Sequence, residues 1–373
     1  MQARPSRSRR ERINRWGRVM LKSKSSDVLS GPEVFPETFR DVDHLEEFMS
    51  TPTLAVVEDL ASLEGDVAVL GVAGKVGVCL ARMIKRAAPD KRVIGVARFS
   101  EEGLEAHLQG WGVETIRCDL LDEAAVNALP KVANVIYMAG MKFDYKGRED
   151  LLWAMNTIAP GIVAKAFAGS RIVAFSTIHV YPWSNPLHGG TGEDTPPFAR
   201  PGEYANSVVG RERTFQYYSR RFGTPGRIAR LVYAIDMRYG VLQEIASWVM
   251  SRTPIPLDTG HANIIWQGDA TAQIIRLLRH CEVPSSPLNI GGPETVSVRK
   301  LALDFGELLG IEPVFTGTEQ TDCLLVNCEA AADLLGNPVV PVRTQVRWVA
   351  DWVKSGKPVY DKPSKFQIRS GVF

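Results

Sequence analysis

The chain has 373 residues, of which 45% are hydrophobic and 23% charged, and its formal net charge is +2. This composition is typical of a globular protein that can bury a large core, and the length predicts two domains or one domain with a smaller lobe. Because the balance of charge is nearly even, the body of the chain gives no reason to expect a nucleic acid or a membrane as its partner.

The basic residues are concentrated at the start, where residues 1–24 contain nine Lys or Arg and one Glu. Such a segment could be a transit peptide, an arm for nucleic acid, or translated sequence ahead of a true start at Met20. We expect residues 1–26 to form a dispensable, disordered tail, because this composition cannot bury apolar surface. No apolar run approaches the ~18 residues of a membrane span, and no secretory signal follows the basic run, so the expected location is cytoplasmic.

The cysteines show neither a disulfide framework nor a metal site. They are scattered, and no His or second Cys pair lies at metal-ligand spacing. They are Cys79, Cys118, Cys281, Cys323 and Cys328. We therefore expect no bound metal.

Residues 27–65 form an expected lead-in with two short helical patterns, 42–50 and 55–63. From residue 66 onward, short β-rich runs alternate with helical patterns, which favours a parallel sheet covered by helices. The expected strands are 66–72, 92–98, 114–118, 134–140, 171–177 and 227–234. The fold class predicted is α/β, with a Rossmann-type doubly wound parallel sheet over residues 66–240.

Residues 241–373 predict a smaller, mainly helical substrate lobe and a C-terminal tail, with some strands returning to the Rossmann domain. The Phe residues of the tail suggest docking onto the body or onto a neighbouring subunit, so a homodimer is possible.

A glycine motif follows the first expected strand. Gly71, Gly74 and Gly77 have the spacing G-x-x-G-x-x-G at a strand-to-helix junction, with Lys75 and Val76 between the last two. Glycines allow a tight turn and close approach of a pyrophosphate, while the helix N-terminus faces the anion. The context predicts dinucleotide binding.

The end of the second expected strand bears on the choice of dinucleotide. Ala97 stands where a carboxylate would bind a ribose 2′-hydroxyl, and Arg98 and Ser100 follow. A guanidinium suits a 2′-phosphate, so NADP is favoured over NAD. Alternatively, Arg98 is solvated or stacks on the adenine of NAD.

Several motifs in this order resemble the extended short-chain dehydrogenase/reductases, the NAD-dependent epimerase/dehydratase family. They are GVAGKVG, CDLLD, VIYMAG, AMNTIAPG, FSTIHVYP, EYANSVVGRE and LNIGGPETVSVRKLA, and the resemblance spans residues 66–351. It implies cofactor contacts from Asp119, Leu120, Ala139, Gly140 and Asn156. It also implies that Thr177 and Tyr204 are catalytic, with Tyr204 next to the cofactor.

The chain departs from the family at one catalytic position, because Val208 stands where the lysine of the Tyr-x-x-x-Lys motif is expected. A tyrosine with an ordinary pKa near ~10 needs a neighbouring cation to act as a base at neutral pH. Arg211 on the same helix and Lys142 after the fourth strand are candidates for that cation. The alternatives are that Arg211 is solvated and that Lys142 is an ordinary loop charge.

A second departure concerns the substrate. Residues 261–269, HANIIWQGD, lack the arginine that nucleotide-sugar enzymes of the family place there, which favours a free sugar, sugar acid or lactone. His179, Tyr233 and Arg238 are further candidates for substrate contacts, although loop hydrogen bonding, packing and ion pairing are alternatives. The sequence predicts an NAD(P)-dependent oxidoreductase or epimerase of such a small molecule. A regulatory nucleotide-binding protein or a dehydratase stays open.

Overall fold

The structure is a computed structural model, and it describes residues 28–29, 35–143, 145–198, 201–360 and 362–371. The tail predicted to be disordered, residues 1–26, lies outside these residues.

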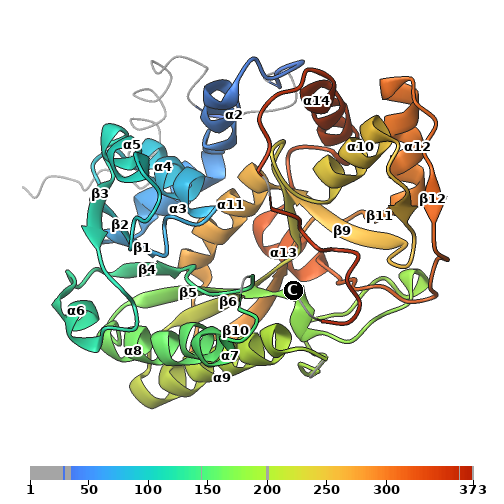
Figure 1. Ribbon diagram of the computed structural model, residues 1–373. Coiled ribbons are helices and arrows are strands. Elements are labelled where there is room, and N and C mark those ends of the chain that lie inside the picture. Colours follow the sequence, from blue (N-terminus) through green and yellow to red (C-terminus); the bar gives the residue numbers. More distant parts are fainter. Residues whose placement is uncertain (1–27, 30–34, 144, 199–200, 361, 372–373) are drawn as a thin grey trace, which may run out of the picture.

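The core of the fold is a seven-stranded sheet in the order β10-β6-β5-β4-β1-β2-β3, with every neighbouring pair parallel (Figure 1). Its strands are β1 (Val67–Leu70), β2 (Val93–Ala97), β3 (Glu114–Arg117), β4 (Asn134–Tyr137), β5 (Arg171–Thr177), β6 (Gly226–Leu231) and β10 (Ser286–Ile290). The strand order reverses between β1 and β4, and ligands of such sheets bind at the carboxyl ends beside this switch point. The predicted fold class is confirmed.

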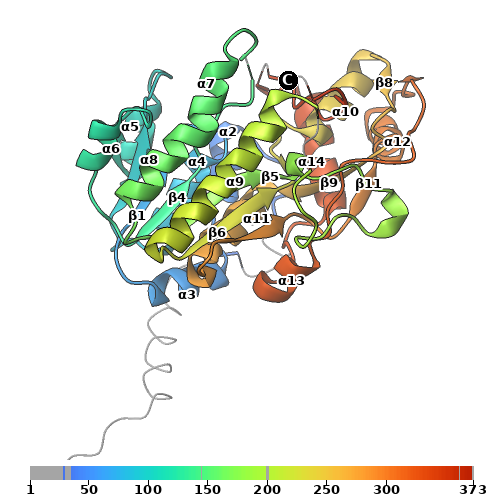
Figure 2. The ribbon, with the colours of Figure 1, turned by 90° about the horizontal axis from the view of Figure 1, so that it is seen from below.

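Helices cover both faces of the sheet, as the burial of all four residues of β1 requires. Val67 and Val69 pack in one apolar cluster, and Ala68 and Leu70 pack in another. One layer contains α6 (Glu123–Ala128), α7 (Glu149–Trp153), η2 (Ala154–Ile158), α8 (Ala159–Ala166) and α9 (Glu203–Phe222). In Figure 2, α7, η2 and α8 follow one another in one line, and α9 runs beside them. The other contains α3 (Leu54–Ser62), α4 (Gly77–Ala87) and α11 (Gln267–Arg276). The short elements α5 (Leu104–Gly110), η3 (Ile178–Val180), η4 (Pro186–His188) and η5 (Leu277–His280) complete this part.

The smaller lobe contains more β-structure than the sequence predicts. A three-stranded sheet has the order β11-β9-β7, and β12 pairs with β8. The strands are β7 (Tyr233–Ile235), β8 (Ile255–Pro256), β9 (His261–Trp266), β11 (Thr295–Ser297) and β12 (Phe315–Thr316), and the helices are α10 (Val241–Ser251), α12 (Val298–Leu309), α13 (Glu329–Leu335) and α14 (Val342–Lys354). β10 returns to the main sheet beside β6.

The lead-in packs against this lobe. Helix α2 (Val42–Met49) begins at Asp41, whose side chain accepts a hydrogen bond from the His44 N–H. The ring centroid of Phe39 lies 5.0 Å from that of Trp348, and the centroid of Phe48 lies 5.4 Å from it. Aromatic packing therefore holds the lead-in beside the sheet edge where the site forms.

None of the helices in the described ranges is both long enough and apolar enough to cross a membrane.

Candidate functional site

The glycine motif forms a turn that can accommodate side chains at only some positions. Gly71 has a φ of +92°, and an added Cβ would lie 2.6 Å from the backbone nitrogen of Ala139. A Cβ on Gly77 would lie 2.4 Å from the carbonyl oxygen of Val72, whereas one on Gly74 would make only an ordinary contact. The first and third glycines are thus required by the backbone, as the sequence predicts.

The helix that follows is open at its N-terminus. The N-cap of α4 is Val76, and no side chain caps this end with a hydrogen bond. Free N–H groups and the helix dipole favour an anion there. Lys75 directly precedes this N-cap, and its ammonium lies 3.1 Å from the ring centroid of Tyr239 and has no hydrogen-bond partner among the described residues. This end of the site is therefore suited to a pyrophosphate.

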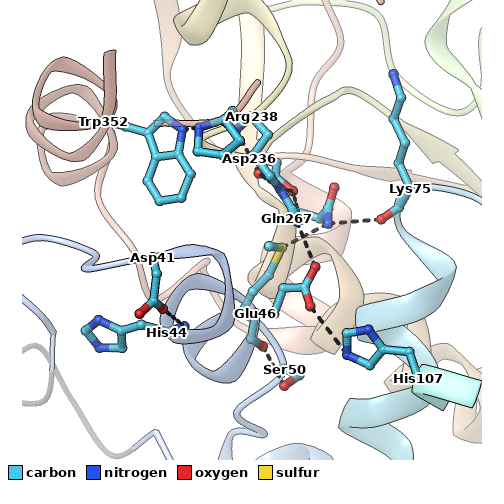
Figure 3. A network of polar contacts seen from close by, with 12 residues as sticks. Asp41, His44, Glu46, Ser50, Lys75, His107, Asp236, Arg238, Gln267 and Trp352 are labelled. Atoms are coloured by element: carbon cyan, nitrogen blue, oxygen red, sulfur yellow. Dashed lines mark hydrogen bonds and ion pairs between the residues drawn. The ribbon is translucent and has the colours of Figure 1, made fainter. Parts of the chain in front are cut away.

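A groove of about 630 Å³ runs beside the glycine turn, and part of its lining is drawn in Figure 3. Arg238 lies here, where its guanidinium binds Asp236 (2.7 Å) and Glu46 of α2 (2.7 Å). Glu46 also faces His107 at 3.9 Å. Of the roles considered for Arg238, the structure therefore favours ion pairing. Glu46 was not predicted to reach this groove, because nothing in the sequence indicates it.

The residues expected around the adenosine lie at the ends of β2 and β3. Ala97 is buried, and Arg98 and Ser100 are exposed. The carbonyl oxygen of Arg98 accepts a hydrogen bond from Arg117 at 3.4 Å. Asp119 is exposed and its Oδ1 accepts from the N–H of Leu121 at 3.0 Å, while Leu120 is buried. The groove itself is lined by Glu101 rather than by Arg98.

Asn156 holds the segment that follows β4. Its Oδ1 accepts hydrogen bonds from the N–H of Met141 (3.0 Å) and from Arg211, and its Nδ2 donates to the Met141 carbonyl (2.9 Å) and to Ser207 Oγ (2.9 Å). A Cβ on Gly140 would collide with the Arg211 guanidinium. Asn156 thus positions residues 139–142, and Arg211 is buried rather than solvated.

A chamber of about 170 Å³ lies at the carboxyl edge of the sheet. Its polar lining comes from Lys75, Lys142, Thr177, His179, Tyr233, Tyr239, Gln267 and Ser364. Thr177 is hydrogen-bonded to Tyr204. The His179 ring lies between two tyrosines, with its centroid 5.8 Å from that of Tyr204 and 6.3 Å from that of Tyr233. The structure thus brings the predicted catalytic pair together with two of the substrate candidates.

No cation takes the place of the missing lysine in the turn of α9 from Tyr204 to Val208. Val208 is fully buried in the apolar core. Two other cations lie near Tyr204. The Lys142 ammonium is 5.6 Å from its ring centroid, and Arg211 follows Tyr204 in α9 by seven residues, which is about two helical turns. Burial raises the pKa of Tyr204, while the Arg211 charge and the hydrogen bond with Thr177 oppose this rise. Both candidates for the cation are therefore beside the phenol.

The two lysines of the chamber, Lys75 and Lys142, have lowered pKa values. Burial and the neighbouring Lys75 charge lower the pKa of Lys142 to about 7, and burial together with Lys362 lowers the pKa of Lys75 to about 8. Glu244 opposes both shifts. Lys142 can therefore exchange a proton near neutral pH.

Comparison with known proteins agrees with this geometry. Residues 67–235 match the NAD dependent epimerase/dehydratase family. A search of curated proteins gave no match.

Solved structures share the fold at low identity. MoeE5 in complex with UDP-glucose and NAD is 19% identical, with a TM-score of 0.64 over 78% of this chain and 99% of that one. The UDP-glucuronic acid 4-epimerase from Bacillus cereus with UDP-glucuronic acid and NAD is 17% identical, with a TM-score of 0.65 over 78% and 99%. The UDP-glucose 4-epimerase from Thermus thermophilus with NAD is 18% identical, with a TM-score of 0.64 over 77% and 98%. The family match over residues 67–235, the glycine turn and the shared fold together identify this part of the chain as an NAD dependent epimerase/dehydratase domain.

Proposed function

We propose that the protein catalyses hydride transfer between a nicotinamide dinucleotide and a carbinol carbon of a small sugar, sugar acid or lactone. The observation that carries the proposal is the Thr177–Tyr204 hydrogen bond at the edge of a chamber of about 170 Å³. Pockets for drug-sized ligands usually measure ~300–1,000 Å³. The size of the chamber supports a free substrate over a nucleotide-linked one.

The side chains suit the proton transfer that accompanies hydride transfer. A bound dinucleotide supplies the hydride acceptor, and the glycine turn, the α4 N-terminus and Lys75 would hold its phosphates. Thr177 and Tyr204 hydrogen-bond the substrate oxygen, and Tyr204 in its phenolate form takes the hydroxyl proton as the carbon is oxidised. Lys142 lies close enough to favour the phenolate and to exchange that proton with solvent. In this way Lys142 performs the role of the absent lysine, and Arg211 adds a fixed positive charge.

Two outcomes of the chemistry are consistent with the site. A dehydrogenase releases the oxidised product, whereas an epimerase returns the hydride to the opposite face of the same carbon. A dehydratase needs a carboxylate or a similar acid/base beside Thr177, and the described residues that line the chamber include no Asp or Glu.

The choice of dinucleotide is a finer proposal. The family is NAD-dependent, and the absence of a carboxylate at Ala97 together with Arg98 supports a preference for NADP. We also propose a homodimer and a cytoplasmic location. Ile158 and Tyr217, on the adjacent elements η2 and α9, are 57% and 54% exposed, which suits a surface between subunits.

The test is the absorbance of the reduced nicotinamide during incubation with NAD or NADP and a panel of aldoses, sugar acids and lactones. We expect turnover of at least one free compound. Binding of the dinucleotide without turnover of any compound in the panel would instead support the regulatory nucleotide-binding alternative.

A further inference from the structure

The C-terminal segment crosses the mouth of the reactive chamber. We call residues 357–371, of which the structure describes all but residue 361, the strap. After α14, the strap N–H of Tyr360 donates to the carbonyl oxygen of Arg238 at 2.9 Å. Phe366 is 2% exposed, and its ring centroid lies 6.4 Å from that of Tyr233 and 5.9 Å from that of Trp248. The strap is thus anchored in the smaller lobe, beside the chamber.

The far end of the strap reaches the Rossmann domain. The guanidinium carbon of Arg369 lies 4.0 Å from the ring centroid of Trp183, which follows β5, and Arg369 also binds Asp322 at 2.5 Å. A Cβ on Gly202 would collide with the carbonyl of Gly371, so the two backbones are in close contact just before Tyr204. The strap therefore spans from one side of the chamber to the other.

One strap residue forms part of the chamber wall. Ser364 is 2% exposed, lines the chamber, and donates from both N–H and Oγ to the carboxylate of Glu244, the Oγ at 2.8 Å. The Glu244 carboxylate acts electrostatically on Lys75 and Lys142 across the same space. Removing Ser364 would leave a buried carboxylate without these donors, so this part of the strap is built into the site.

The strap also covers the groove beside the glycine turn. Pro358, Val359, Tyr360 and Lys362 line that groove opposite Gly74 and Lys75. One short segment therefore forms part of the wall of both hollows.

We propose that the strap sets the substrate size limit, admitting a free sugar or sugar acid and excluding a sugar that carries a nucleotide. This inference rests on the proposed function. A nucleotide would extend from the chamber into the space that Ser364 and Phe366 fill, and both side chains are buried. The proposal separates this protein from neighbours solved with UDP-glucose or UDP-glucuronic acid.

Two strap variants and a matched control test the proposal. A chain ending at Val359 lacks most of the strap. Arg369→Ala releases the far anchor without making a cavity in the core. The control is Arg299→Ala, because Arg299 is also partly exposed, binds Glu319 at 2.6 Å and lies 4.8 Å from the ring centroid of Phe315.

The first measurement is calorimetric binding of UDP-glucuronic acid in the presence of the dinucleotide. We expect both strap variants to bind at least about tenfold more tightly than the full chain and Arg299→Ala, a difference of ~1.4 kcal/mol or more. Equal affinity for the full chain and the strap variants, or turnover of UDP-glucuronic acid by the full chain, would overturn the proposal.

The second measurement is the rate at which an amine reagent labels Lys142, which does not depend on nucleotide recognition. It tests the proposal if none of the proteins binds UDP-glucuronic acid. Trinitrobenzenesulfonate, a bulky amine reagent, should label Lys142 at least about tenfold faster in the strap variants than in the full chain and the control. Equal labelling rates would contradict the proposal. If the size discrimination holds and no sugar is turned over, the proposed function fails and the strap inference stands.

Discussion

Two groups of buried charge lie within the same part of the Rossmann domain, and they differ in how they are balanced. Beneath the chamber, Glu212 binds Arg230 through two hydrogen bonds of 2.9 and 2.7 Å and accepts another from Ser176 at 2.5 Å. In the chamber, burial and the Lys75 charge lower the pKa of Lys142, burial and the Lys362 charge lower that of Lys75, and the Glu244 carboxylate opposes both shifts without cancelling them.

This difference in charge balance separates buried charges that stabilise the fold from buried charges that can bind a ligand. A buried pair is stable when its partners satisfy each other, so Glu212 and Arg230 need nothing from outside. Two lysines held close together favour their neutral forms, and an arriving anion reverses that preference. The second group therefore marks the binding site.

The largest expected effect is a loss of turnover when the catalytic tyrosine beside the chamber is changed. Tyr204→Phe should lower turnover of an active sugar by about 10²–10⁴-fold, because it removes the group that transfers the proton. Affinity for the dinucleotide should change little. Tyr217→Phe is the matched control, since Tyr217 lies on the same helix but is 54% exposed. Unaltered turnover in Tyr204→Phe would remove this residue from the mechanism.

The next largest expected effect is a loss of stability when the buried Glu212–Arg230 pair is broken. Glu212→Gln leaves the Arg230 guanidinium buried without a carboxylate, and breaking a buried pair costs ~3–5 kcal/mol. Denaturant unfolding should show this loss, whereas Glu123→Gln, which breaks the exposed pair with Lys165, should cause a much smaller one, because solvent screens exposed ion pairs. Similar small losses in both variants would mean that the buried pair is not a structural requirement.

The chamber lysines should make stability depend on pH in a definite direction. The folded-state pKa of Lys142 is about 7, below its value in the unfolded chain. Between these values the unfolded state binds more protons, so the free energy of unfolding rises with pH from about 7 towards ~10. Lys142→Met should flatten this rise in the melting temperature, while Lys146→Met, at an exposed position nearby, should not. A rise that is equally steep in both variants would contradict the assignment.

The smallest expected effect concerns the choice of dinucleotide. Arg98→Ala should remove the preference for NADP over NAD, because a guanidinium on a phosphate contributes a charge-assisted hydrogen bond worth ~1.5–3 kcal/mol. Calorimetry with both dinucleotides measures it. Equal affinities for NAD and NADP in the wild-type protein would refute the preference.

Local patterns were sufficient to predict the glycine turn and six strands of the main sheet, but not its edge strand β10. The strands alternate with helices, and Gly71 and Gly77 occupy positions that the backbone reserves for glycine. β9 was missed, because its six residues, HANIIW, are too few to give a clear period in a lobe of helical character.

The site depends on contacts that no local pattern records. Lys142 reaches Tyr204 from 62 positions earlier in the chain, and Glu46 and Ser364 enter from opposite ends of the sequence. The sequence could name Lys142 and Arg211 as candidates because both carry charge near the carboxyl edge. Only the packing of α9 against β4 and β5 shows that both lie beside the phenol.

The most direct test of the central claim, that Lys75 and Lys142 are held in readiness for an anionic dinucleotide, is proton exchange on binding. NAD and NADP are titrated calorimetrically at pH 8 in two buffers of different ionisation enthalpy, with wild-type protein, Lys142→Met and Lys75→Met. We predict proton uptake by the wild type, because phosphate charges raise the pKa of both lysines, and smaller uptake by each variant. Binding without proton uptake, or with the same uptake in all three proteins, would contradict the account.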